Sequence, residues 1–301
     1  MKKIISFGIY NKRPKDILGS ICNCLLSPII YPGWICRIYY DDSVPKECID
    51  LLNFLSKEKI LNHSINIELI DMSEHWLKGH NRLMWRFLPI SDDDVEISIS
   101  RDGDSLISMR EKVCVDDWLK SDKILHIIRD HCYHSKEMMA GMWGIRKINN
   151  KYIDIEKLLK NNLDILEKGN DQDFLRDNIY KKNMDKLFIH TEKQFAMNDE
   201  GKPHLPGKEI WKTGGYFPYE KNIKLIPDYE KWDEWIPELS FKKRNSINTF
   251  LCAHCRKHHD VLIGNILEHF SPDLVKYLGN LFKKCGYDIN KIDFQPPISI
   301  V

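Results

Sequence analysis

Short apolar runs alternate with helical patterns along the first 130 residues, and this alternation constrains the fold more than any other feature of the chain. Apolar runs typical of β-strands cover residues 4–9, 35–40, 65–70, 95–100 and 124–128. Between them, apolar residues recur at helical spacing after Pro45 and from Ser108 onward. Alternating strands and helices predict an α/β fold with a mostly parallel, doubly wound sheet flanked by helices.

The charge balance excludes some classes of partner. The chain has 45 Lys+Arg against 44 Asp+Glu, a formal net charge of +1. Proteins that bind a nucleic-acid backbone or an anionic bilayer carry a clear basic excess, so we expect no nucleic-acid partner. We also expect no signal peptide and no transmembrane segment, because the apolar runs are too short for either. Nine cysteines without a disulfide framework favour a reducing compartment, and we expect a cytoplasmic protein.

The strongest chemical signal is the segment Asp102-Gly103-Asp104, which directly follows the apolar run at residues 95–100. In nearly extended backbone, side chains two residues apart point the same way, so both carboxylates can converge on one divalent cation. In an open α/β sheet, ligands bind outside the carboxyl ends of the strands. A solvated acidic turn explains the same residues, and the pattern alone leaves both interpretations open.

Two further clusters carry candidate chemistry. Asp171, Gln172 and Asp173 crowd the start of a predicted helix, where helix capping or binding of sugar hydroxyls would explain them. Near the other end of the chain, Cys252 and Cys255 lie close to His258 and His259. This second cluster is compatible with a structural zinc site, a redox pair or a buried group of reduced thiols.

Several stretches together resemble a family of glycosyltransferase-like proteins with the GT-A fold. The resemblance is carried by YYDDSVP (39–45), MWRFLPISD (84–92), SRDGDSLISMREK (100–112), the run at 115–135, MMAGMWGIRK (138–147) and NDQDFLRDNIY (170–180). It also extends to retaining nucleotide-sugar transferases, in which a DxD motif binds a manganese diphosphate and a DQD element faces the donor sugar. Cys132 stands where relatives lead us to expect proline. The heavy use of Lys and Ile favours an AT-rich source genome, such as that of a large DNA virus.

The resemblance implies a role for each matching position. Asp102 and Asp104 would bind Mn²⁺ (or Mg²⁺) and the donor, and Asp171, Gln172 and Asp173 would lie beside the transferred sugar. His190 would complete the metal shell, although a structural histidine fits the same place. Arg86 would pair with phosphate or with a buried acid, and Asp41 would accept from the base or close a turn before Pro45. The remaining donor-binding positions would be Phe7, Gly8, Ile9, Tyr10, Arg101, Gly103 and His131.

The function expected from this resemblance is a metal-dependent glycosyltransferase. It would transfer a sugar from a nucleotide-diphosphate sugar, a UDP-sugar, to a hydroxyl of a carbohydrate, lipid or protein acceptor, with retention. Two other functions stay open: a catalytically inactive GT-A domain that binds glycans or proteins, and a nucleotidyltransferase or phosphohydrolase. We expect a GT-A domain at residues 1–245 and a helical C-terminal extension at 246–301.

Overall fold

The computed structural model describes residues 1–11, 14–60, 62–78, 82–129, 136–149, 151–162, 171–191 and 222–225, together with residues 276, 279 and 280. The predicted boundary at 245/246 and the cluster around Cys252 and Cys255 lie outside these residues. Among the helices that are described, none combines the length and the apolar character that crossing a bilayer requires.

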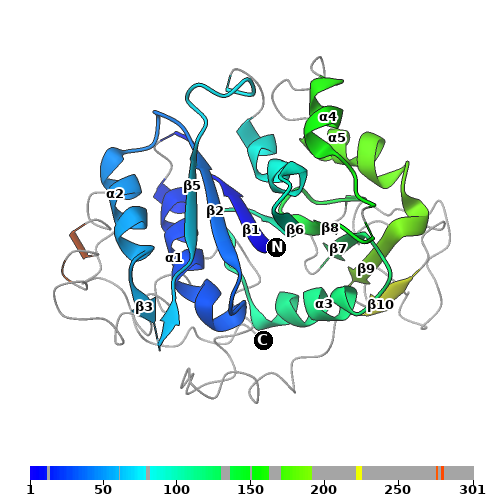
Figure 1. Cartoon of the computed structure of the whole chain (residues 1–301), viewed down its shortest axis with the longest axis horizontal. Helices are drawn as coiled ribbons and strands as arrows, with labels where there is room; N and C mark the ends of the chain where they lie inside the picture. Colours follow the sequence, from blue (N-terminus) through cyan, green and yellow to red (C-terminus); the bar gives the residue numbers. More distant parts are fainter. Residues whose placement is uncertain are drawn as a thin grey trace, which may run out of the picture. The chain divides into compact units, whose positions relative to one another are not determined.

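An eight-stranded sheet organises the described residues (Figure 1). Its order is β10-β9-β7-β8-β6-β1-β2-β5. The pairs β1–β6, β2–β5, β7–β9 and β9–β10 are parallel, whereas β8 runs antiparallel to β6 and β7. The strands are β1 (Lys2–Gly8), β2 (Ile35–Tyr40), β5 (Ile67–Asp71), β6 (Val95–Arg101), β7 (Leu125–Arg129), β8 (Met142–Arg146), β9 (Leu187–Thr191) and β10 (Ile223–Leu225), and a separate pair is β3 (Lys59–Ile60) with β4 (His63–Ser64).

The predicted α/β class is confirmed, because the sheet is mostly parallel and flanked by helices. The GT-A type stays a prediction, and the predicted helical C-terminal extension lies outside the described residues, apart from three positions. All five predicted strands occur within about two residues of their expected bounds. The sequence did not predict β8, β9 and the short strands β3, β4 and β10. β8 is short and carries Gly144 at its centre, which weakens the strand signal in the sequence.

The described chain divides into two compact units. One, here called the α1 unit, contains Phe7–His75 and Asp102–Met109. The other, here called the β8 unit, contains the described residues of Met1–Ser6, Trp76–Arg101 and Arg110–Asp228.

Two helices flank the strands of the α1 unit. Helix α1 (Pro14–Ile30) contacts β2, and helix α2 (Lys46–Leu55) lies beside β5 (Figure 1). The helical spacing expected after Pro45 is confirmed, because the buried residues of α2 are Cys48, Leu51, Leu52 and Leu55. Burial of this stripe fixes the helix on the sheet.

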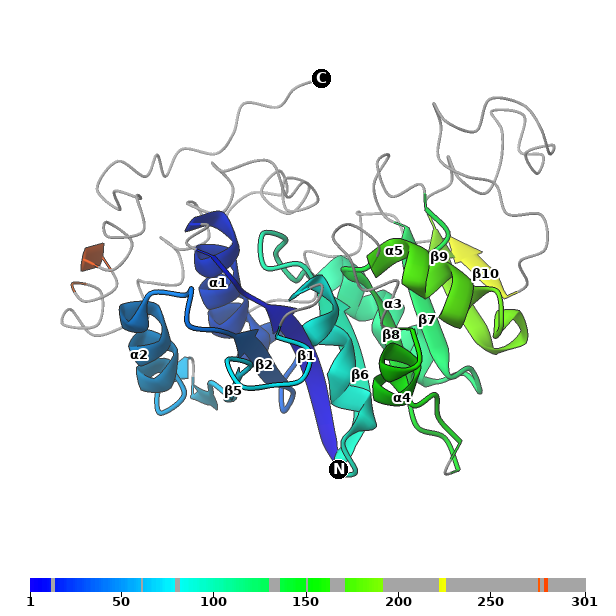
Figure 2. The same ribbon diagram turned by 90° about the horizontal axis from the view of Figure 1, so that it is seen from above.

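In the β8 unit, helix α3 (Met109–Leu119) lies alongside β7 and β8 (Figure 2). A Cβ on Gly144 would lie 3.0 Å from the Trp118 ring, so glycine allows the indole to pack against the sheet. Trp118 in turn stacks on His126, with ring centroids 5.1 Å apart. The other helical elements are η1 (Arg82–Ser91), α4 (Ile155–Lys160), α5 (Asp171–Phe174), η3 (Leu175–Tyr180) and η4 (Met184–Lys186).

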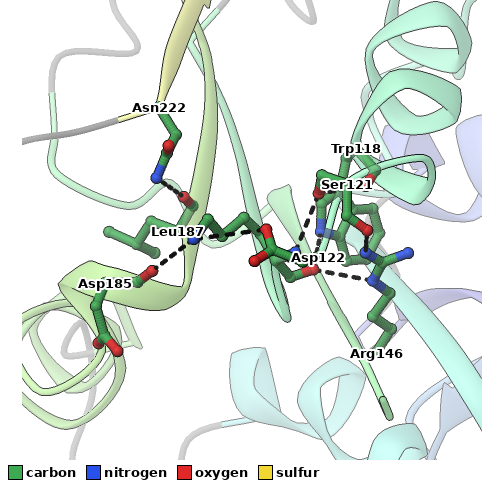
Figure 3. Close-up of polar contacts among 8 residues, drawn as sticks. Trp118, Ser121, Asp122, Arg146, Asp185, Leu187 and Asn222 are labelled. Atoms are coloured by element: carbon green, nitrogen blue, oxygen red, sulfur yellow. Dashed lines mark hydrogen bonds and ion pairs between the residues drawn. The ribbon is translucent and has the colours of Figure 1, made fainter. Parts of the chain in front are cut away.

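Arg146 fixes the connection between α3 and β7 (Figure 3). Its buried guanidinium donates to the carbonyl oxygens of Leu119 at 2.7 Å and Lys123 at 2.9 Å, and also to that of Ser121. Trp118 Nε1 donates to the same Lys123 oxygen at 2.9 Å. One arginine therefore provides hydrogen-bond donors for three carbonyl oxygens at the end of α3 and in the turn that follows it.

Candidate functional site: an acid turn held by helix α1

The chain leaves strand β6 at Arg101 and turns through Asp102, Gly103 and Asp104. The amide of Ser105 donates to the carbonyl of Asp102 at 3.2 Å, which closes the turn. Both aspartates are half-buried, and Gly103 is buried. We call residues 102–104 the acid turn. Its position after a strand of a mostly parallel sheet is the one expected from the sequence.

Helix α1 packs directly on the backbone of the acid turn. A Cβ on Gly19 would lie 1.9 Å from the carbonyl oxygen of Gly103. In the opposite direction, a Cβ on Gly103 would lie 2.7 Å from both the Asp16 carbonyl oxygen and Ser20 Oγ. Since real Cβ contacts are never this short, both positions require glycine for the helix to approach so closely.

Asn23 holds the segment that follows the acid turn. Its side chain is fully buried on α1, where Nδ2 donates to the Ser105 carbonyl at 2.9 Å. Its Oδ1 accepts from the Ile107 amide, also at 2.9 Å. Neither Gly19 nor Asn23 was predicted from the sequence, because the groups they contact lie more than 80 residues further along the chain.

The predicted nucleoside-binding residues lie where strand β1 ends. Phe7 and Ile9 are fully buried, and the Ile9 amide donates to the Tyr39 carbonyl at 2.8 Å. Gly8 and Tyr10 are half-buried. Phe7 and Ile9 therefore serve the core, and Gly8 and Tyr10 are the members of this group with accessible surface.

Asp41 closes a turn after strand β2. Its Oδ1 accepts from the Ser43 amide at 3.1 Å and from the Ser43 hydroxyl, while its own carbonyl accepts from the Val44 amide. Ser43 Oγ in turn accepts from the Asn11 amide at 2.6 Å. These contacts favour the turn interpretation of Asp41, and contact with a base stays a prediction.

The DQD element begins a helix whose first residue points inward. Asp171 is buried, and its Oδ2 lies 3.5 Å from Nη2 of Arg86 on η1. Its Oδ1 accepts from the Gln172 amide at 2.9 Å. Asp173 points outward and pairs with Arg176 on the following turn. Arg86 thus pairs with a buried acid, one of the two partners that the sequence predicted.

Arg101 is buried in the β8 unit, at the end of strand β6. Its Nε donates to Glu111 Oε1 at 3.0 Å, and its Nη1 donates to the Ser100 and Trp143 carbonyls at 2.7 and 3.2 Å. Arg101 as a whole is 1% exposed. These contacts favour a role in folding, and binding of a nucleotide by Arg101 stays a prediction.

His190 on strand β9 has protein partners at both ring nitrogens. Nδ1 lies 2.9 Å from His126 Nε2, and Nε2 lies 3.3 Å from Asp117 Oδ2. Asp117 also binds Lys224 at 2.8 Å. Metal binding by His190 stays a prediction, and it would require one of these partners to be exchanged. His131 lies outside the described residues.

Burial keeps both histidines of this pair neutral. It lowers the pKa of His190 to about 4 and the pKa of His126 well below the ordinary value of 6.5. Asp117 opposes the shift at His190, while Arg101 and Arg146 add to the shift at His126. A buried histidine whose pKa is lower in the folded than in the unfolded chain makes the folded state most stable above about pH 6.5. This contribution to the free energy of unfolding is lost as the pH falls toward 4.

We therefore expect the free energy of unfolding to fall by about 2 kcal/mol between pH 7 and pH 5 from His190 alone, because the unfolded chain takes up the proton first. Urea unfolding at the two pH values measures this change, and the His190→Gln variant should lose most of it. An exposed-histidine variant, His63→Gln, controls for the removal of any histidine. Equal pH dependence in wild type and His190→Gln would contradict the assignment.

The acid turn fits a divalent cation by the chemistry of its donors. Two carboxylates are hard oxygen ligands of the kind that Mn²⁺ and Mg²⁺ prefer. Within the residues that the structure describes, no group of three or more His, Cys, Asp and Glu side chains is placed to hold a metal. Asp102 and Asp104 would therefore supply two ligands, and water or phosphate oxygens would supply the others.

Comparisons with known proteins concern the fold. No protein-family model and no curated protein sequence matches the chain. Among solved structures, the galactosyltransferase LgtC in complex with donor and acceptor sugar analogues is similar, with 11% identity and a TM-score of 0.43. The match covers 82% of this chain and 95% of that one.

Proposed function

We propose that this protein is a metal-dependent glycosyltransferase that uses a nucleotide-diphosphate sugar, a UDP-sugar, as donor. The observation that carries the proposal is the acid turn: two carboxylates directly after strand β6 of a mostly parallel α/β sheet. Ligands of such sheets bind outside the carboxyl ends of the strands. The sequence resemblance to glycosyltransferase-like proteins with the GT-A fold suggests that the ligand bound there is a metal ion with a nucleotide-diphosphate sugar.

In the proposed reaction, Asp102 and Asp104 would hold Mn²⁺ or Mg²⁺ together with the donor diphosphate. A cation bound there would supply positive charge to the diphosphate, which would make the diphosphate a better leaving group. The acceptor hydroxyl attacks the anomeric carbon, the bond from that carbon to the diphosphate oxygen breaks, and the hydroxyl proton leaves with the departing phosphate or a nearby base. The acceptor is a carbohydrate, a lipid or a protein hydroxyl.

Asp171, Gln172 and Asp173 are proposed to contact the transferred sugar and to set retention. Arg86 supports this role by fixing the orientation of the Asp171 carboxylate. The helix also changes from α5 to the π-helical segment η3 directly after this element. Segments of π-helix occur frequently at functional sites.

The other donor contacts are proposed from the resemblance, and partial exposure also supports Gly8 and Tyr10. Gly8 and Tyr10 would border the nucleoside, while Asp41, Arg101 and His131 would contact the base or phosphates. We also propose a cytoplasmic location, because the cysteines suggest a reducing compartment.

Binding of donor and metal tests the proposal. A nucleoside diphosphate such as UDP, present with Mn²⁺ at about 100 times its dissociation constant, should stabilise the fold by about 3 kcal/mol and raise the melting temperature by about 5 °C or more. Each ligand alone should raise it less, and EDTA should reverse the gain. A melting curve that is unchanged at millimolar UDP and Mn²⁺ would contradict the proposal.

A binding module without turnover is the second candidate, and specific contacts favour it. Arg86, Arg101 and His190 are all engaged with protein partners, which leaves them less able to meet a substrate. Such a protein would bind nucleotide or glycan and release no product. Nucleoside diphosphate released above background excludes it, and inorganic pyrophosphate as the product would indicate a nucleotidyltransferase instead.

A further inference from the structure

The acid turn is held by its own backbone and by groups from helix α1. The bond that closes it, from the Ser105 amide to the Asp102 carbonyl, is long at 3.2 Å. Two carboxylates bind one cation well only when both are held in a productive geometry. The groups outside the turn that fix its position therefore bear on metal binding.

Helix α1 supplies those groups from one face. Gly19 and Ser20 contact Gly103 within the turn, and Asn23, one helical turn further along, binds the main chain just after it. The packing of Gly19 sets how closely the helix approaches, while the amide of Asn23 sets the register of residues 105–107. Steric contact and hydrogen bonding thus fix the same short segment.

The choice of asparagine at position 23 is informative. The side chain is fully buried, and an apolar residue of similar volume would fill the same space without an amide to desolvate. The amide instead donates to Ser105 and accepts from Ile107, bonds that span 82 and 84 residues of sequence. Both bonds end on main-chain atoms of the loop that carries the acids.

We propose that Asn23 is a positioning residue for the metal-binding acid turn, and that helix α1 thereby sets the affinity of Asp102 and Asp104 for the divalent cation. This inference rests on the proposed function. Mutation of residues that hold metal ligands in position typically changes metal affinity by about 10 to 100-fold.

The test compares Asn23→Leu with a matched control, Asn183→Leu. Asn183 is also buried, and its Nδ2 donates to the Ile179 carbonyl at 2.9 Å, but it belongs to the β8 unit. Two quantities are measured on the full chain: Mn²⁺ affinity by electron paramagnetic resonance, and hydrogen exchange of residues 102–107 by mass spectrometry. Asn23→Ser serves if Asn23→Leu does not fold.

We expect Asn23→Leu to weaken Mn²⁺ binding about tenfold or more and to speed exchange across residues 102–107. Asn183→Leu should lower the melting temperature while leaving Mn²⁺ affinity within about twofold of wild type. Unchanged Mn²⁺ affinity in a folded Asn23 variant would overturn the inference. If wild type itself binds no Mn²⁺, the proposed function and the metal half of this inference both fail, and the exchange rates still decide whether Asn23 positions the turn.

Discussion

Replacing Gly19 with alanine is expected to lower the free energy of unfolding by about 3 kcal/mol, even though alanine is the better helix former. The added Cβ would lie 1.9 Å from the carbonyl oxygen of Gly103, and a backbone atom cannot rotate away as a flexible side chain can. The helix and the acid turn must separate. Equilibrium unfolding in urea measures the change.

Ser20→Ala is the matched control for this substitution. It changes the next residue of the same helix and removes a fully buried hydroxyl that has no hydrogen-bond partner among the described residues. Its effect should stay within about 1 kcal/mol, because no bond is lost and no volume is added. A Gly19→Ala variant as stable as Ser20→Ala would show that the helix and the turn do not pack this closely.

Asp102→Asn and Asp104→Asn are each expected to lower the rate of sugar transfer by roughly a thousandfold or more, equivalent to about 4 kcal/mol of transition-state stabilisation. Each substitution replaces a charged oxygen ligand with a neutral amide of the same shape. The loss should therefore come from metal and diphosphate binding, with little effect on folding. Steady-state rates at several Mn²⁺ concentrations measure it.

Asp50→Asn, which changes an exposed acid on helix α2, is the control for these variants. It should transfer sugar at the wild-type rate, since the residue lies away from the acid turn in sequence and carries no proposed role. Full activity in both Asp102→Asn and Asp104→Asn would remove the acid turn from the mechanism.

Five of the strands and the acid turn could be predicted from the sequence because both depend on local patterns. The apolar run at 95–100 fixes a strand, and the polar residues after it must then form the turn. Helix α2 was predicted for the same reason, from four apolar residues on one face. Asp171 was placed at the start of a helix by its preference for such positions.

The contacts of the site depend on packing between distant segments, which one sequence does not reveal. Nothing near Gly19 in the chain indicates that its partner is Gly103, more than 80 residues further along. Arg86 was predicted with two alternative partners, and only the fold shows that Asp171 lies beside it. The partners of His190 are Asp117 on α3 and His126 on β7. The residues next to His190 in the sequence do not indicate that these elements lie beside it.

The products that residues 1–301 form from a UDP-sugar test the proposed glycosyltransferase activity most directly. Wild type is incubated with Mn²⁺, a panel of UDP-sugars and a mixed pool of carbohydrate, lipid and protein acceptors, and nucleotide products are separated by chromatography. We expect UDP release above the level given by Asp102→Asn, together with glycosylated acceptor, and loss of both on addition of EDTA. No UDP above background with any donor, or UMP and pyrophosphate in its place, would contradict it.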